Sequence, residues 1–104
     1  MIFEIRTYKI HPGHLSEYLA DFERNGLPVI SRYAQLVGYW ITEVGPLNQV
    51  VHMWAYPDAG ARAELRAQLY ADPEWVHGYL PAALIHVQSQ EVRLLKAASF
   101  SPIK

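Results

Sequence analysis

Residues 36–56, LVGYWITEVGPLNQVVHMWAY, contain two runs of β-branched and aromatic residues on either side of Gly45-Pro46-Leu47-Asn48. Such runs are typical of β-strands. Proline fixes one backbone angle of a tight turn, and glycine and asparagine tolerate the others. The segment therefore predicts a β-hairpin. Because an isolated hairpin is at best marginally stable in water, the rest of the chain has to supply further strands and a covering layer.

The two faces of this hairpin are both apolar or aromatic. If Val44 pairs with Gln49, alternation divides the side chains into two sets. One face carries Tyr39, Ile41, Glu43, Val50, His52, Trp54 and Tyr56, and the other carries Trp40, Thr42, Val44, Val51, Met53 and Ala55. Neither set is plainly a solvent face. We expect helices to cover one face and a second copy of the chain to cover the other.

Two further strands are expected at the ends of the chain. Ile2 to Ile10 alternates between an apolar set and a polar but aromatic set, which is typical of a central strand. Leu84 to Leu95 is the expected last strand.

Helices are expected between these strands. A first helix follows His11-Pro12-Gly13 and ends at Asn25-Gly26, and Leu27-Pro28 starts another turn or two. After the hairpin, Asp58 is the expected N-cap of one helix and Asp72-Pro73 opens a shorter one, which Pro81 closes.

This element order predicts an α+β fold of one domain, residues 1–104. Sequential right-handed connections give a ferredoxin-like split βαβ sandwich, βαββαβ with an extra short helix before the last strand. Its four-stranded antiparallel sheet has the helices on one face. We expect the helix-free face to form a homodimer, since each large apolar side chain buried there contributes roughly 1.5 to 3 kcal/mol.

Composition excludes several classes of function. The chain has 9 Lys plus Arg against 10 Asp plus Glu without a long run of either sign, so it lacks the basic surface of a nucleic-acid-binding protein. The absence of cysteine excludes disulfides, thiolate catalysis and Cys-based metal sites. Charged residues in MIFEIRTYKI exclude a signal peptide or a membrane span there, and we expect a cytoplasmic location by default.

The face that carries His52 is the candidate site. A histidine that exchanges protons near neutral pH, an arginine that binds an anion and flat aromatic rings would suit an aromatic substrate. We expect His52 and Arg6 to be catalytic if the first strand lies beside the third. The expected substrate-binding residues are Tyr8, Tyr39, Trp54, Tyr56 and His77. The alternative is that His52 and Tyr39 are hydrogen-bonded core residues.

Three segments resemble the NIPSNAP family, within the dimeric α/β-barrel superfamily. They are FEIRTYKIHPGHLSEYLADFE, LVGYWITEVGPLNQVVHMWAY, and ADPEW leading to VQSQEVRLL. The resemblance implies two ferredoxin-like subunits whose sheets face each other in a dimeric α/β barrel. Superfamily relatives include cofactor-independent quinone-forming monooxygenases and haem-degrading monooxygenases, with the ligand between sheet and helices. The resemblance places Trp54 at the position of a pocket tryptophan in the haem-degrading relatives. It places Arg6 at a second position, where those relatives have a polar residue of another type.

Two classes of function therefore remain open. One is a small-molecule site for an aromatic or quinone-like ligand, used by a cofactor-free oxygenase or isomerase. The other is a non-catalytic structural or protein-interaction module with a filled pocket. We expect no metal and no cofactor, because His11 and His14 lack a carboxylate partner and His77 lacks the apolar slot of a haem ligand. No nucleic-acid or membrane partner is expected.

Overall fold

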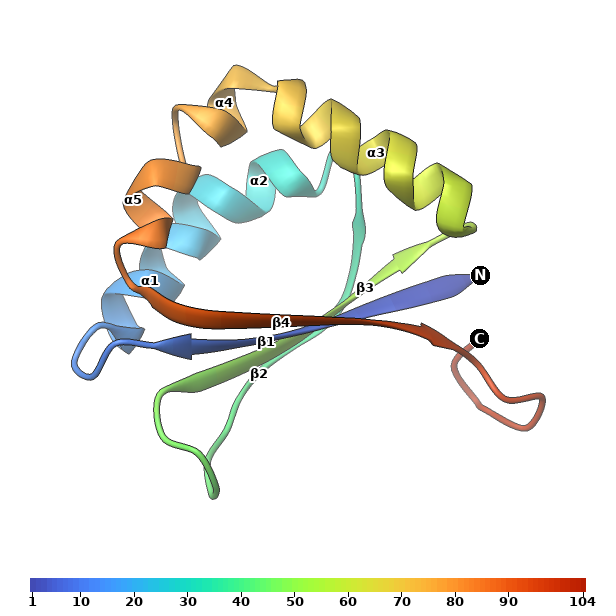
Figure 1. Cartoon of the computed structure of the whole chain (residues 1–104), viewed down its shortest axis with the longest axis horizontal. Coiled ribbons are helices and arrows are strands. Elements are labelled where there is room, and N and C mark those ends of the chain that lie inside the picture. The colour runs from blue at the N-terminus through green and yellow to red at the C-terminus, as the bar shows by residue number, and fades with distance from the viewer.

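The computed structural model describes residues 1–104 as a four-stranded antiparallel sheet with all helices on one face (Figure 1). The strands are β1 (Ile2–Ile10), β2 (Gln35–Ile41), β3 (Gln49–Tyr56) and β4 (Val87–Lys96), in the order β2-β3-β1-β4. The expected α+β ferredoxin-like fold is confirmed, with β1 at the centre. As a result, His52 on β3 and Arg6 on β1 are direct cross-strand neighbours.

The helices after β1 form one continuous layer. They are α1 (Leu15–Asp21), a π-helical turn η1 (Phe22–Gly26) and α2 (Leu27–Ile30). The expected end of the helix at Asn25-Gly26 is wrong. A β-carbon on Gly26 would lie 2.8 Å from Cζ of Tyr79, so glycine here allows close packing rather than a stop. The wide turn also accommodates Pro28, which has no backbone N–H to donate.

The hairpin has the expected faces but another register. Tyr39 pairs with His52 and Ile41 with Val50, and the backbone N–H of Thr42 donates to the carbonyl of Gln49 at 3.0 Å. The predicted pairing of Val44 with Gln49 is therefore wrong by two residues. A two-residue shift keeps every side chain on its face. Residues 42–48 instead form a longer loop, in which Gly45 and Asn48 have φ angles of 132° and 57°.

Three helices lie between β3 and β4: α3 (Ala59–Ala71), α4 (Pro73–Val76) and α5 (Leu80–Leu84). The Asp58 carboxylate caps α3 through the N–H of Ala61, and Asp72 caps α4 through the N–H of Glu74, as expected. Pro81 does not close a helix, because it stands in the first turn of α5. Its missing N–H is harmless at that position. The last strand consequently begins at Val87 rather than Leu84.

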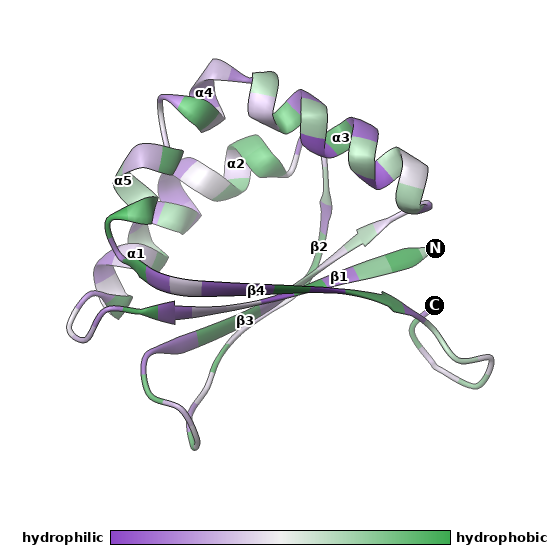
Figure 2. Ribbon diagram, in the orientation of Figure 1, coloured by the Kyte–Doolittle hydropathy of each residue, from purple (hydrophilic) through white to green (hydrophobic).

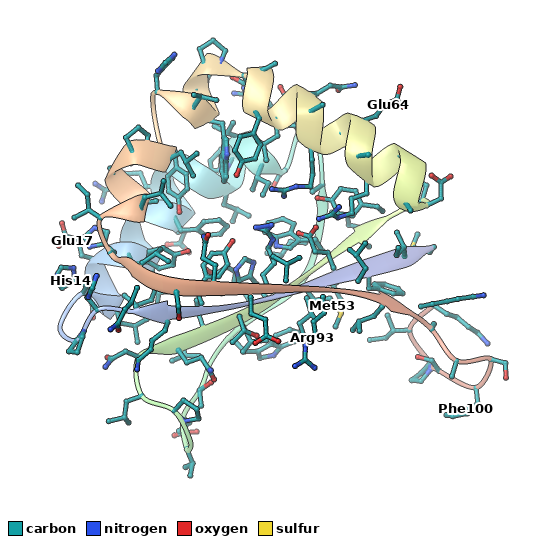
Figure 3. All side chains as sticks on the ribbon, in the orientation of Figure 1. His14, Glu17, Met53, Glu64, Arg93 and Phe100 are labelled. Carbon is teal, nitrogen blue, oxygen red and sulfur yellow. The ribbon has the colours of Figure 1, made fainter.

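The helix-free face of the sheet is partly apolar. Met53 and Arg93 project from this face, whereas Glu64 projects from the outer side of α3 (Figure 3). The C-terminal tail folds back below the sheet (Figure 1), where Ser101 and Ile103 border a groove with Phe3. Figure 2 shows polar and apolar residues interleaved along α3, which covers the opposite face. None of the helices combines the length and the apolar character needed to cross a membrane.

Candidate functional site

A cavity of about 320 Å³ lies between the sheet and the helical layer. Its floor comes from β1, β3 and β4, and its roof from α1, η1, α2, α3, α4 and α5. Most of its wall is aromatic or aliphatic. The lining residues are Arg6, Tyr8, Tyr18, Phe22, Ile30, His52, Trp54, Arg66, Tyr70, Trp75, Tyr79, Leu80, Ala83, Leu84, Val87 and Gln90. The volume falls within the range of small-ligand sites, roughly 300–1,000 Å³.

The protonation of His52 is fixed by its neighbour on the same strand. The indole Nε1–H of Trp54 donates to Nδ1 of His52 at 2.7 Å. Since indole N–H is a donor only, Nδ1 of His52 must present a lone pair, and the proton of the neutral ring must be on Nε2. That Nε2 atom is buried and has no hydrogen-bond partner. His52 therefore presents an unpaired N–H donor.

His52 also stays neutral at physiological pH. Burial, together with the nearby positive charge of Arg6, lowers the pKa of His52 from 6.5 to about 3. The ring stacks on Tyr39 with centroids 4.5 Å apart and meets the edge of Tyr8 at 4.8 Å. This environment does not support a histidine that exchanges protons near neutral pH, and the catalytic roles expected for His52 and Arg6 stay predictions. The neutral ring carries one N–H, on Nε2, that is available as a hydrogen-bond donor.

Other polar groups of the cavity wall are also donors. Nη1 of Arg6 donates to the hydroxyl oxygen of Tyr8 at 2.7 Å, which leaves the Tyr8 proton free to donate. Nε1 of Trp75 is buried without a partner. Burial raises the pKa of Tyr8, and it raises that of Tyr18 to about 12, so both remain protonated. The cavity wall therefore presents several hydrogen-bond donors that have no partner within the chain.

Glu4 positions the arginines beside the cavity. The sequence did not identify it as a site residue. Its carboxylate is 1% exposed and accepts hydrogen bonds from Nε of Arg6, at 2.7 Å, and from Nε of Arg62. Nη1 of Arg66 lies 3.9 Å from the same carboxylate. Arg62 and Arg66 are four residues apart on α3 and so share one face of that helix. That spacing was the available sequence signal for this cluster.

The segment that roofs the cavity, residues 73–85, is attached by side chains at both ends. Before it, Asp72 accepts hydrogen bonds from Arg32 at 2.9 Å and from Tyr33 at 2.7 Å. After it, Nδ1 of His86 lies 3.0 Å from Nδ1 of His14. These contacts hold Trp75 and Tyr79 over the sheet.

Not all of the expected site residues line the cavity. Arg6, Tyr8, His52 and Trp54 do. Tyr39 lies behind His52 and supports its ring, and Tyr56 is buried outside the lining, so direct contact of these two with a ligand in the cavity is not supported. The expectation for His77 is wrong, because it is an exposed residue after α4.

The histidines at the start of α1 do not form a metal centre. His11 and His14 have ring centroids 5.7 Å apart, and His14 is paired with His86 instead. No group of three or more His, Cys, Asp or Glu side chains is arranged to hold a metal ion.

Comparison with known proteins establishes the family. The NIPSNAP family model matches residues 3–102. The chain belongs to the NIPSNAP family. It is 36% identical over 98 residues to human Protein NipSnap homolog 3A, with 91% of this chain and 39% of that protein aligned, so it spans about two fifths of that relative.

Solved structures support the same assignment. A NIPSNAP domain protein from Burkholderia xenovorans has a TM-score of 0.94 at 40% identity, covering 98% of this chain and 99% of that one. SnoaB, a cofactor-independent oxygenase from Streptomyces nogalater, has a TM-score of 0.69 at 19% identity, covering 97% and 96% of the two chains. At that identity the likeness to SnoaB shows the fold alone.

The low pKa of His52 predicts how the stability of this NIPSNAP chain depends on pH. The unfolded chain binds the proton near pH 6.5 and the folded chain only near pH 3. Protons therefore favour the unfolded state in this window, and stability is lost as the pH falls through it. The loss from this one group is on the order of 4 kcal/mol. We expect His52→Gln, which cannot titrate, to reduce the pH dependence of the free energy of unfolding between about pH 6.5 and 3.

Urea unfolding at a series of pH values measures this. His77→Gln is the matched control, because His77 is exposed, and it should leave the wild-type slope unchanged. An unchanged slope in His52→Gln would contradict a neutral, buried His52.

Proposed function

We propose that the chain binds a planar aromatic or quinone-like molecule in the cavity between sheet and helices, with a ligand oxygen at His52. The observation that carries this proposal is the donor-rich wall. His52 and Trp75 each present a buried N–H without a partner, and Tyr8 has a free hydroxyl proton. Unpaired buried donors are costly, so a ligand that offers acceptor oxygens gains from pairing with them. The surrounding rings supply stacking surfaces for a flat molecule.

The proposed ligand binds best with its oxygen ionised. The Arg6 guanidinium, which lines the cavity and donates to the Tyr8 hydroxyl, favours an anion there. His52 is not a general base here, because its ring already carries the Nε2 proton, and burial keeps Tyr8 and Tyr18 protonated. Ionisation must therefore come from the acidity of the ligand itself, increased by the positive site. This disfavours an isomerase, which has to move a proton between two positions of its substrate.

Cofactor-independent oxygenation is the reaction class that we propose. An ionised hydroxyarene can transfer electrons directly to dioxygen, and a hydroxyarene plus one O₂ gives a quinone plus one H₂O. The chain would bind the anion and exclude water, and dioxygen would be the oxidant. The description of SnoaB as a cofactor-independent oxygenase supports this class by fold analogy only.

Removing the Tyr8 hydroxyl should weaken binding of 2-naphthol. A hydrogen bond to a charged oxygen contributes about 1.5 to 3 kcal/mol, so Tyr8→Phe should raise the dissociation constant by about tenfold or more. Isothermal titration calorimetry measures the constant, and the absorption of bound 2-naphthol reports its ionisation. Thr42→Val is the control for the loss of one hydroxyl, since the Thr42 hydroxyl donates to Gln49 at the hairpin loop and neither residue lines the cavity.

The absence of saturable binding to the wild-type chain would favour the structural-module alternative. That alternative assumed that side chains fill the pocket, whereas the structure has a cavity of about 320 Å³.

We also propose that a second copy of the chain packs on the helix-free face. Trp40 on this face is 52% exposed and Leu95 is 37% exposed. The Trp40 ring lies over Gly38, where a β-carbon would come within 2.3 Å of it, so the indole covers the strand as a flat apolar surface. Glu91 and Arg93, paired at 2.7 Å on β4, provide both signs of charge on this face. A surface of this composition is complementary to itself, as a twofold interface requires.

Light scattering coupled to size-exclusion chromatography tests the dimer. We expect the wild-type chain to elute at twice its monomer mass and Trp40→Glu to elute as a monomer, because a carboxylate would be buried in the interface. Val44→Glu is the control, since Val44 is 93% exposed in the hairpin loop. A monomeric wild-type chain at micromolar concentration would contradict the proposal. The expected cytoplasmic location stays a prediction.

A further inference from the structure

The charges around the cavity are not balanced. Arg6, Arg62 and Arg66 surround the single carboxylate of Glu4, which leaves a net charge of +2. The two oxygens of Glu4 each accept a hydrogen bond from one of two guanidinium groups, those of Arg6 and Arg62. Arg66 is the third, and its nearest nitrogen is 3.9 Å from the carboxylate. Arg66 therefore keeps hydrogen-bonding capacity that Glu4 does not use.

The excess charge faces the cavity. Arg6 and Arg66 line it and Arg62 does not. Both lining arginines lie close to Oε1 of Glu4, at 2.7 and 3.9 Å, so their guanidinium groups are near one another. A carboxylate placed between two guanidinium groups can accept charge-assisted hydrogen bonds from both.

Arg66 is also held in a suitable orientation. Its guanidinium carbon lies 5.3 Å from the centroid of the Tyr70 ring. A guanidinium that packs on a ring keeps its N–H edges available for a planar anion. The exposed lining residues Tyr70, Leu84 and Gln90 mark where the cavity meets solvent, so Arg66 lies near this opening.

We propose that the ligand is an aromatic hydroxy acid, whose carboxylate binds between Arg6 and Arg66 while its hydroxyl oxygen meets the donors at His52. This inference rests on the proposed function and adds the carboxylate to it. A ligand with one negative charge would leave part of the +2 charge uncompensated. The cavity, at about 320 Å³, is at the small end for ligand sites, which suits one or two fused rings.

Three naphthalene probes separate the two groups of the ligand: 6-hydroxy-2-naphthoate, 2-naphthoate, which lacks the hydroxyl, and 2-naphthol, which lacks the carboxylate. In calorimetric titrations of the full chain we expect 6-hydroxy-2-naphthoate to bind at least about tenfold tighter than either of the others. Arg66→Gln should remove this advantage over 2-naphthol and change the affinity for 2-naphthol by less than about threefold.

Two further variants keep the test interpretable. Arg66→Lys retains the charge without the planar fork, so it should fold like the wild type and show an intermediate affinity for 6-hydroxy-2-naphthoate. Arg24→Gln is the control, because Arg24 is exposed on η1 and does not line the cavity, and it should match the wild type.

Each outcome has a distinct meaning. Equal affinity for 6-hydroxy-2-naphthoate and 2-naphthol would overturn the carboxylate site and leave the proposed function standing. An Arg66→Gln variant that weakens both probes equally would also overturn it. If no probe binds to the wild-type chain, both proposals fail.

Discussion

The ion-pair cluster at Glu4 is the interaction on which the site depends. Its carboxylate, almost without solvent exposure, joins the central strand β1 to α3 through Arg62 and positions Arg6 beside the cavity. A buried carboxylate is stable only when its hydrogen-bonding capacity is satisfied, and two guanidinium groups satisfy it here. One consequence is structural, because the hydrogen bond between Arg62 and Glu4 ties α3 to β1. The other is electrostatic, since a positive excess is held beside an apolar wall where charge is weakly screened.

The second constraint is the hydrogen bond between Trp54 and His52. It uses the only lone pair of the neutral His52 ring and places the proton on the other nitrogen. Tyr39 and Tyr8 pack against the ring and exclude water, which keeps it uncharged. His52 is thereby a hydrogen-bond donor rather than a general base. The chemistry of His52 is therefore set by the residues packed around it. One of them, Tyr39, does not line the cavity and acts only through the His52 ring.

Much of this fold could be predicted from local patterns. Alternation in residues 2–10 and 49–56 gave the central strands and brought Arg6 beside His52. Local patterns failed where distant packing decides. Gly26 is a typical helix stop, but here its lack of a side chain admits the ring of Tyr79, fifty-three positions away in the sequence. The proton position on His52 and the convergence of Arg62 and Arg66 on Glu4 likewise depend on contacts between elements, which periodicity does not report.

The most direct test of this account is the NMR spectrum of the His52 imidazole. Long-range ¹H–¹⁵N correlations of the wild-type chain, assigned with His52→Gln, distinguish the protonated ring from its two neutral tautomers. We expect a neutral ring at pH 7 with the proton on Nε2, and a shift of that N–H resonance when 2-naphthol is added. An imidazolium at pH 7, the Nδ1–H tautomer, or an N–H signal that does not respond to bound 2-naphthol would contradict it.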